Sequence, residues 1–93
     1  MSVDWIERPV TIVNRLGLHA RAAAKLVTLA AEFDSEVYLV RETRQVDAKS
    51  IMGVLMLAAS KGTALTLKAR GNDAEAAVEA LADLIQRRFD EAS

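Results

Sequence analysis

The spacing of the apolar residues changes its period several times along this chain, and this alternation restricts the fold more than any other feature. Residues 10–13, which follow Pro9, alternate and are rich in β-branched side chains, as is typical of a strand. Between residues 20 and 32 the apolar positions instead recur at helical spacing. By the same criteria the sequence predicts strands over residues 36–41, 44–47 and 63–70 and helices over residues 50–59 and 74–90. The predicted order of elements is therefore β-α-β-β-α-β-α.

This order fits an α+β domain with a single core. The chain has 93 residues, of which 52% are apolar and 27% charged. Such a size and composition are typical of one small globular domain. Residues 36–41 and 44–47 would pair as a hairpin, and the helices would cover one face of an antiparallel sheet. We expect one domain over residues 1–93, with residues 1–8 as an N-terminal extension.

The last predicted helix carries clear signals at both ends. Asp73 is a residue type that commonly caps a helix N-terminus with its side chain. Arg87 and Arg88 would lie at the negative, C-terminal end of the helix dipole. The apolar stripe that would face the core consists of Ala74, Val78, Leu81, Ile85 and Phe89.

The absence of cysteine and the single histidine exclude several kinds of site. Without cysteine there are no disulfides, no thiolate nucleophile and no zinc–thiolate site, and one histidine cannot form a His-paired metal site. These features leave carboxylate sites for hard cations open, but no metal-ligand spacing is present, and we expect no metal and no cofactor. No apolar run approaches the ~18 residues of a membrane span, and the N-terminus lacks the features of a secretory signal. We expect a cytoplasmic protein without membrane insertion.

Charge is distributed unevenly along the chain. Residues 8–70 carry ten basic and five acidic side chains, whereas residues 73–93 carry six acidic and two basic ones. The resulting basic face would suit an anionic ligand or an acidic partner. The basic residues are not interleaved with aromatic side chains that could stack on bases, so we do not expect a nucleic-acid binder.

His19 stands where the first helix begins, a position that usually holds Ser, Thr, Asp or Asn. An imidazole followed by Ala20, Arg21 and Ala22 offers no short side-chain oxygen, so the first-turn amides would remain free to bind an anion. Arg21 adds a guanidinium suited to phosphate oxygens. The positive helix end favours a neutral imidazole, which is a nucleophile that can accept a phosphoryl group. The residues alone leave open that His19 is an ordinary surface loop residue and Arg21 a solvated charge.

Ser50 would be the N-cap of the second helix. The residues allow two interpretations. The first is a purely structural cap. The second is a phosphorylation site at which the helix dipole would stabilise the phosphate, while the added charge beside an apolar surface would disrupt docking.

The helix after Ser50 has more apolar residues than one buried face needs. Residues 51–59 are Ile-Met-Gly-Val-Leu-Met-Leu-Ala-Ala. If Met52 or Leu55 is exposed, this surface would be a docking patch, and methionine adapts to several partners. The alternative is that the whole segment belongs to the core of a small domain.

Two motifs in this chain, taken together, carry a family resemblance. Residues 17–21 are Gly-Leu-His-Ala-Arg, and residues 49–55 are Lys-Ser-Ile-Met-Gly-Val-Leu, followed by Gly62. At this separation they resemble the HPr family of histidine phosphocarriers of the bacterial phosphoenolpyruvate-dependent phosphotransferase system, over about residues 8–90. The resemblance implies an open-faced β-sandwich, in which a four-stranded antiparallel sheet carries three helices on one face.

The resemblance also implies a function. His19 would accept a phosphoryl group at Nδ1 from phosphorylated enzyme I and pass it to a histidine of an enzyme IIA, with Arg21 as the active-site arginine and the amides of Ala20 and Arg21 binding the phosphate. Such a chain is a monomeric carrier and co-substrate, not an enzyme in the strict sense. Ser50 would be the regulatory serine, modified by a serine kinase and restored by its phosphorylase. The implied partner surface comprises Ala20, Ala24, Lys25, Lys49, Ile51, Met52 and Leu55.

Ala22 stands where many sugar-pathway members of the family have proline. The run Arg-Ala-Ala-Ala-Lys at residues 21–25 is more similar to the nitrogen-related branch, in which the phosphate serves regulation rather than sugar uptake. Both the sugar and the nitrogen-regulatory roles stay open at this point. A hypothesis of a different class is a regulatory binding module whose partners read the phosphorylation of His19 or Ser50.

Overall fold

The elements of the fold follow the predicted order, with one short 3-10 helix after the last α-helix. The computed structural model describes residues 4–93. The elements are β1 (Ile6–Thr11), α1 (Ala20–Ala30), β2 (Glu36–Arg41), β3 (Arg44–Asp47), α2 (Ile51–Met56), β4 (Ala64–Arg70), α3 (Ala74–Gln86) and η1 (Arg88–Asp90). The bounds of β2 and β3 are those that the sequence predicts.

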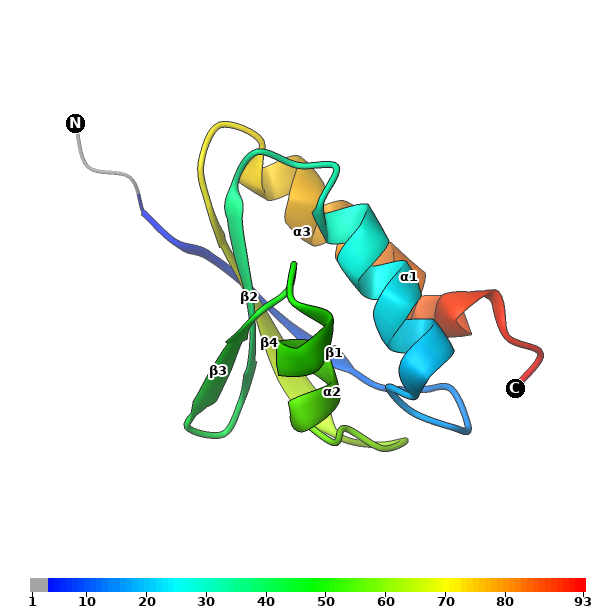
Figure 1. Ribbon diagram of the computed structural model, residues 1–93. Coiled ribbons are helices and arrows are strands. Elements are labelled where there is room, and N and C mark those ends of the chain that lie inside the picture. The colour runs from blue at the N-terminus through cyan, green and yellow to red at the C-terminus, as the bar shows by residue number, and fades with distance from the viewer. Residues whose placement is uncertain (1–3) are drawn as a thin grey trace.

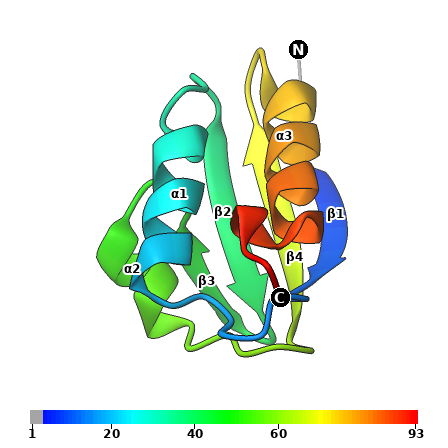
Figure 2. The same cartoon turned by 90° about the vertical axis from the view of Figure 1, so that its right-hand side faces the viewer.

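The four strands form one antiparallel sheet in the order β1-β4-β2-β3. The three α-helices lie on the same face of this sheet, with α2 beside the first turns of α1 (Figures 1 and 2). Within residues 4–93, no element covers the opposite face of the sheet. The predicted α+β fold, an open-faced sandwich of a four-stranded antiparallel sheet and three helices, is confirmed.

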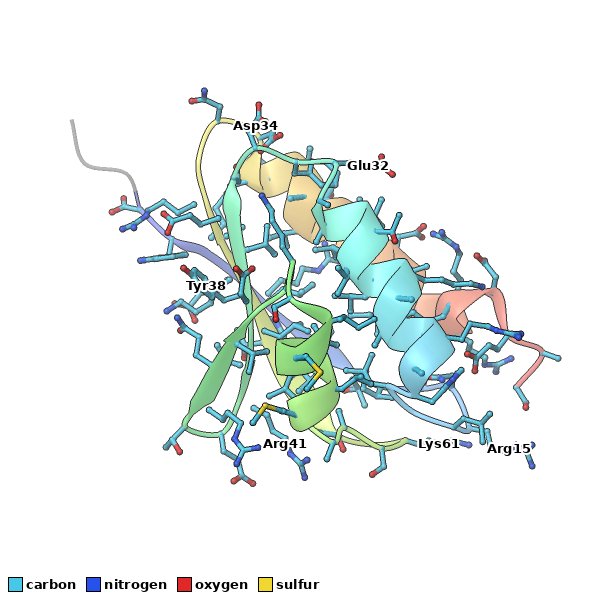
Figure 3. The ribbon with its side chains drawn as sticks, viewed as in Figure 1. Arg15, Glu32, Asp34, Tyr38, Arg41 and Lys61 are labelled. Carbon is cyan, nitrogen blue, oxygen red and sulfur yellow. The ribbon has the colours of Figure 1, made fainter. Side chains whose placement is uncertain are left out.

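The core lies between the sheet and the helices. On β4 the side chains of Leu65, Leu67 and Ala69 are buried, as the alternation predicts. Tyr38 of β2 projects from the other, open face (Figure 3). On α1 the core-facing residues include Ala22 and Ala23, which are fully buried. Their small side chains allow α1 to pack closely on its neighbours.

The first strand differs from the prediction at both ends. β1 begins at Ile6 rather than at residue 10 and ends at Thr11 rather than at residue 13. Pro9 lies inside it, opposite Thr66. Proline is tolerated there because β1 is an edge strand, paired on one side only, where a missing N–H need not remove a ladder bond. Residues 6–8 therefore belong to the sheet and not to an extension; residues 1–3 of the expected extension lie outside the described residues.

Trp5 continues the line of β1 onto the open face of the sheet. Its ring meets Tyr38 edge to face, with 5.6 Å between the ring centroids. The Lys68 ammonium lies 4.8 Å and the Arg70 guanidinium 4.3 Å from the Trp5 ring centroid. Both distances are within the range of cation–π attraction. These contacts hold the chain on the sheet before β1 begins.

The second helix is shorter than predicted. α2 ends at Met56 rather than at residue 59, and Ala58 has a left-handed backbone with φ of 51°. Arginines of the β2–β3 hairpin bind the carbonyls at this end. Arg44 donates to the Met56 carbonyl at 2.7 Å, and Arg41 donates to the Leu57 carbonyl at 2.7 Å. These side chains satisfy acceptors that a longer helix would have used internally.

The third helix also ends early, at Gln86 instead of residue 90. Arg88, Phe89 and Asp90 then have positive φ, between 54° and 64°, so the chain turns sharply within η1. Phe89 is completely buried. Its helical spacing is therefore misleading: the ring reaches the core through this turn. The rest of the predicted stripe is buried on α3, at Ala74, Val78, Leu81 and Ile85.

Asp73 does not cap α3 with its side chain, contrary to the prediction. Its carboxylate instead accepts bonds from the Ser35 amide at 2.9 Å, the Ser35 hydroxyl at 2.5 Å and the Asp34 amide at 2.9 Å. It thereby joins the α1–β2 loop to the start of α3. Gly71 makes this approach possible, because a Cβ there would lie 2.5 Å from the Ser35 hydroxyl oxygen.

Candidate functional site

His19 occupies the N-cap of α1, as predicted. Its backbone is extended, with φ of −71° and ψ of 175°, and its carbonyl accepts the first helical bond from Ala23 at 2.8 Å. The imidazole makes no capping hydrogen bond. Within residues 4–93, the amides of Ala20, Arg21 and Ala22 donate to no acceptor. A side chain that is 29% exposed therefore stands beside free helix amides.

The loop before His19 is fixed in position by its contact with the α2–β4 connection. Leu18 donates to the Ala59 carbonyl at 2.8 Å. Gly17 has φ of 67°, and a Cβ on it would lie 2.5 Å from the same carbonyl oxygen. Only glycine fits this turn without displacing the backbone of the neighbouring segment. The motif glycine thus sets where α1 begins and where the imidazole lies.

The C-terminal segment completes the site, and sequence reasoning missed it. One oxygen of the Glu91 carboxylate lies in hydrogen-bond contact with His19 Nε2, and the other accepts from the Asn14 side-chain amide at 3.0 Å. The Arg15 amide donates to the Ser93 carbonyl at 3.0 Å. Figure 2 shows the C-terminus next to the loop that leads into α1. Glu91 lies 72 positions from His19 in the chain, so no local spacing signals the contact.

Glu91 is held as a carboxylate. Burial raises the pKa of Glu91, since the side chain is only 17% exposed. The hydrogen bonds from the Asn14 amide and the His19 ring and the positive charge of Lys25 act in the opposite direction. Together they bring the pKa of Glu91 below its ordinary value. The imidazole therefore faces an anion on its Nε2 side.

Arg21 is exposed on the first turn of α1. It lines the same pocket of about 220 Å³ as His19, Glu91 and Arg15. The guanidinium and the free amides can bind the oxygens of an anion attached to the imidazole. The predicted pair of His19 and Arg21 is thus brought together at one pocket.

Ser50 is the N-cap of α2, and its hydroxyl accepts from the Gly53 amide at 3.1 Å. The structural interpretation of this serine is therefore confirmed. The Gly53 backbone packs closely against this hydroxyl, since a Cβ on Gly53 would lie 3.4 Å from it. The neighbouring Lys49 donates its ammonium to the Phe33 carbonyl at 2.7 Å. Lys25 is engaged in a similar way, donating to the Phe89 carbonyl at 2.7 Å.

Exposed apolar side chains lie on α2 and in the loop that leads to His19, and together they are called the apolar patch. We define it by the exposed large apolar side chains, which are between 41% and 66% exposed: Leu16, Ile51, Met52 and Met56. Ile51 and Met52 were predicted, whereas Leu16 and Met56 were missed. The predicted Leu55 is half-buried and packs against the core. Ala20 and Ala24 are exposed on the adjoining turns of α1. The segment after Ser50 is therefore divided between the two interpretations. Its exposed side chains fit a docking patch, whereas Val54 and Leu57 belong to the core.

No helix within residues 4–93 is long and apolar enough to cross a membrane.

A family model with the description "PTS HPr component phosphorylation site" matches residues 6–87. The chain belongs to the HPr family. The family resemblance carried by the two sequence motifs is confirmed.

Members of the HPr family resemble the chain over almost all of its length. Phosphocarrier protein HPr of Cupriavidus necator is 56% identical over 86 residues, which cover 92% of this chain and 97% of the relative. Phosphocarrier protein NPr of Shewanella violacea is 50% identical over 88 residues, which cover 95% and 97%. The crystal structure of HPr from Thermoanaerobacter tengcongensis matches with a TM-score of 0.91 at 42% identity, over 95% of this chain and 99% of that one.

Proposed function

We propose that this protein is a phosphocarrier that accepts a phosphoryl group on His19 from phosphorylated enzyme I and passes it to a histidine of an enzyme IIA. It acts as a co-substrate of the relay, in the cytoplasm, rather than as an enzyme in the strict sense. The observation that carries the proposal is the part-exposed imidazole at a helix N-terminus with free amides, beside the guanidinium of Arg21.

The chemistry is an in-line displacement between two histidines on docked proteins. A ring nitrogen of His19 attacks phosphorus as the donor's nitrogen–phosphorus bond breaks. Catalysis consists mostly of positioning and charge stabilisation. The amides of Ala20 and Arg21 and the Arg21 side chain would bind the phosphoryl oxygens. Because the imidazole is part-exposed at a surface pocket, the group stays accessible to the next acceptor.

The partners would dock on the apolar patch and on the adjoining alanines of α1. Such a patch gives a rapidly reversible contact, and nearby cations steer acidic partners. Arg15 and Arg21 supply exposed charge at its edge. Lys25 and Lys49 are partly committed to carbonyls of the chain itself, so their contribution would be mainly long-range attraction.

Phosphorylation of Ser50 would regulate docking. The hydroxyl lies at the first turn of α2, next to Ile51 and Met52 of the apolar patch. A phosphate there adds a charge of about −2 beside apolar side chains that partners must cover. A serine kinase and its phosphorylase would be the enzymes that set this state.

The test is transfer in a reconstituted relay. Incubation with phosphoenolpyruvate and purified enzyme I should place an acid-labile phosphate on wild-type protein and on the matched control Ser50→Ala, but not on His19→Ala. Mass spectrometry of alkaline digests locates the label. Persistent labelling of His19→Ala would overturn the assignment.

The branch is then identified by the acceptor. Phosphorylated protein is mixed separately with a sugar-type and a nitrogen-type enzyme IIA. The enzyme IIA that rapidly takes up the phosphate identifies the branch in which the protein acts. The run at residues 21–25 favours the nitrogen type, and relatives of both names have similar identity. If neither accepts phosphate although a partner binds tightly, the protein is a regulatory binding module instead.

A further inference from the structure

Asn14, Glu91 and His19 form a hydrogen-bonded chain that the motifs do not contain. We propose that Glu91, itself held by Asn14, is a positioning residue that keeps the proton of His19 on Nε2 and so presents Nδ1 as the phosphoryl acceptor. This inference rests on the proposed function, since it concerns the same imidazole. It adds two residues and a defined task to the site.

The contact itself dictates the tautomer. An ionised carboxylate only accepts hydrogen bonds, and one oxygen of Glu91 lies at Nε2. The neutral ring with its proton on Nε2 donates to that oxygen. The opposite tautomer would turn the Nε2 lone pair toward the carboxylate, which is repulsive. The proton therefore stays on Nε2, and the lone pair on Nδ1 is left for the reaction.

The carboxylate also fits the charge that transfer creates. The Nδ1 lone pair forms the new bond to phosphorus, while the donor's nitrogen–phosphorus bond breaks and its electron pair returns to the donor histidine. The Nε2 proton does not leave, so the His19 ring becomes positively charged. Glu91 faces that charge at Nε2, on the side away from the phosphoryl group. The same residue thus orients the nucleophile and stabilises the product.

Asn14 fixes the carboxylate in place. It is fully buried, and its amide nitrogen donates to the Gly17 carbonyl at 2.8 Å and to Glu91 at 3.0 Å. Its carbonyl oxygen is buried and has no hydrogen-bond partner within the described residues. The two bonds of its amide nitrogen join the loop before α1 to the Glu91 carboxylate.

The rest of the C-terminal segment anchors Glu91. Phe89, two residues earlier, is buried in the core, and its carbonyl accepts from Lys25. The Ser93 carbonyl, two residues later, accepts from the Arg15 amide. Glu91 is therefore fixed on both sides.

Nitrogen-15 NMR of the His19 ring in the unphosphorylated protein tests the inference directly. The spectra are recorded at alkaline pH, so that the neutral ring is observed. Wild type should show a protonated Nε2 and an unprotonated Nδ1. The control Glu79→Ala, which removes an exposed carboxylate of α3, should show the same. Glu91→Ala should give a mixture of the two tautomers. Its transfer rate from enzyme I should fall ~10-fold to 100-fold, the loss seen when the carboxylate partner of a metal-bound histidine is removed. Asn14→Ala should move the ring signals in the same direction.

A wild-type ring protonated on Nδ1, or an unchanged tautomer in Glu91→Ala, would overturn the inference. Because Asn14 is buried, its variant could fail to fold, and Glu91→Ala then carries the test alone. The NMR measurement needs no partner and no phosphate. Failure of the proposed function would instead appear as absent labelling of wild-type protein, so the two failures are distinguishable.

Discussion

At the scale of single residues, position 19 shows how one side chain changes the end of a helix. A serine or aspartate at this N-cap would accept from one of the first-turn amides and compete with an anion for that end of the helix. The imidazole leaves them free and meets Glu91 on its other edge. The first property could be predicted from the sequence His-Ala-Arg, because it follows from local backbone rules. The second could not, because it depends on where the chain returns.

Replacing Arg21 should slow phosphoryl transfer without affecting the fold. The side chain is exposed, and it lies at the pocket where the negative charge would develop. Arg21→Ala should lower the rate of phosphorylation by enzyme I by at least ~10-fold, since removing one donor to a developing charge commonly costs this much or more. The control is Lys61→Ala, an exposed cation in the turn before β4. Quenched-flow measurement of both variants decides, and equal rates would count against a role for the guanidinium.

Asp73 should make stability depend on pH in the acid range. The bond from the Ser35 hydroxyl, and after it the Asp34 amide, hold the pKa of Asp73 below its ordinary value of 3.8. A carboxyl with a lowered pKa in the folded state adds stability above its ordinary pKa and loses it as the pH falls through the lowered one. The wild type should therefore be more stable than Asp73→Asn at neutral pH.

This advantage should shrink as the pH falls below 3.8. Urea unfolding of both proteins at a series of pH values measures it. A difference in the free energy of unfolding that stays constant from neutral to strongly acidic pH would show that the charge of Asp73 is not what the loop binds.

At the scale of elements, α2 is a short helix defined by side chains at both ends. Ser50 caps its start, and Arg41 and Arg44 bind the carbonyls at its end. The start could be predicted, because an N-cap signal lies next to the helix in sequence. The end could not, because the arginines come from a hairpin and the apolar run continues to residue 59 without interruption. β1 was misjudged for a similar reason: the prediction began the strand after Pro9, but its edge position, which depends on the whole sheet, allows proline inside it.

Substitutions of Ser50 should separate stability from docking. Aspartate is also a good N-cap, so Ser50→Asp should keep the free energy of unfolding within about 0.5 kcal/mol of wild type, whereas Ser50→Ala should lose about 0.5–2 kcal/mol. For the affinity for enzyme I we expect the reverse: Ser50→Asp should bind more weakly than Ser50→Ala. Only the aspartate adds charge beside the exposed Met52. Chemical denaturation and titration calorimetry measure the two quantities. If Ser50→Asp binds enzyme I as tightly as wild type does, charge at this position does not control docking.

At the scale of the whole molecule, the fold was more predictable than the site. Element order and the layer arrangement follow from the periods of the apolar residues, and these are local. The site is assembled from the loop before α1 and the last residues of the chain, which only the complete fold brings together (Figure 2). The helical spacing of Phe89 predicted a longer α3. An apolar residue in the sequence indicates only that its ring is buried, and here the ring reaches the core from a turn and not from the helix.

Phe89 should be the main anchor of the C-terminal segment. It is among the largest fully buried side chains. Phe89→Ala should reduce the free energy of unfolding by about 3–5 kcal/mol, and Phe89→Leu should reduce it less. The alanine variant should also protect the Arg15 amide less from hydrogen exchange, because that amide donates to Ser93. Unchanged protection would show that the segment is held independently of the ring.

The contact between Ser93 and Arg15 has a practical consequence for anyone who handles this protein. An affinity tag or fluorescent label attached after Ser93 would emerge beside the imidazole and compete with incoming macromolecules. Attachment before β1 would place it at the other end of the molecule (Figure 1). Reporter fusions and immobilised surfaces should therefore be built from that side.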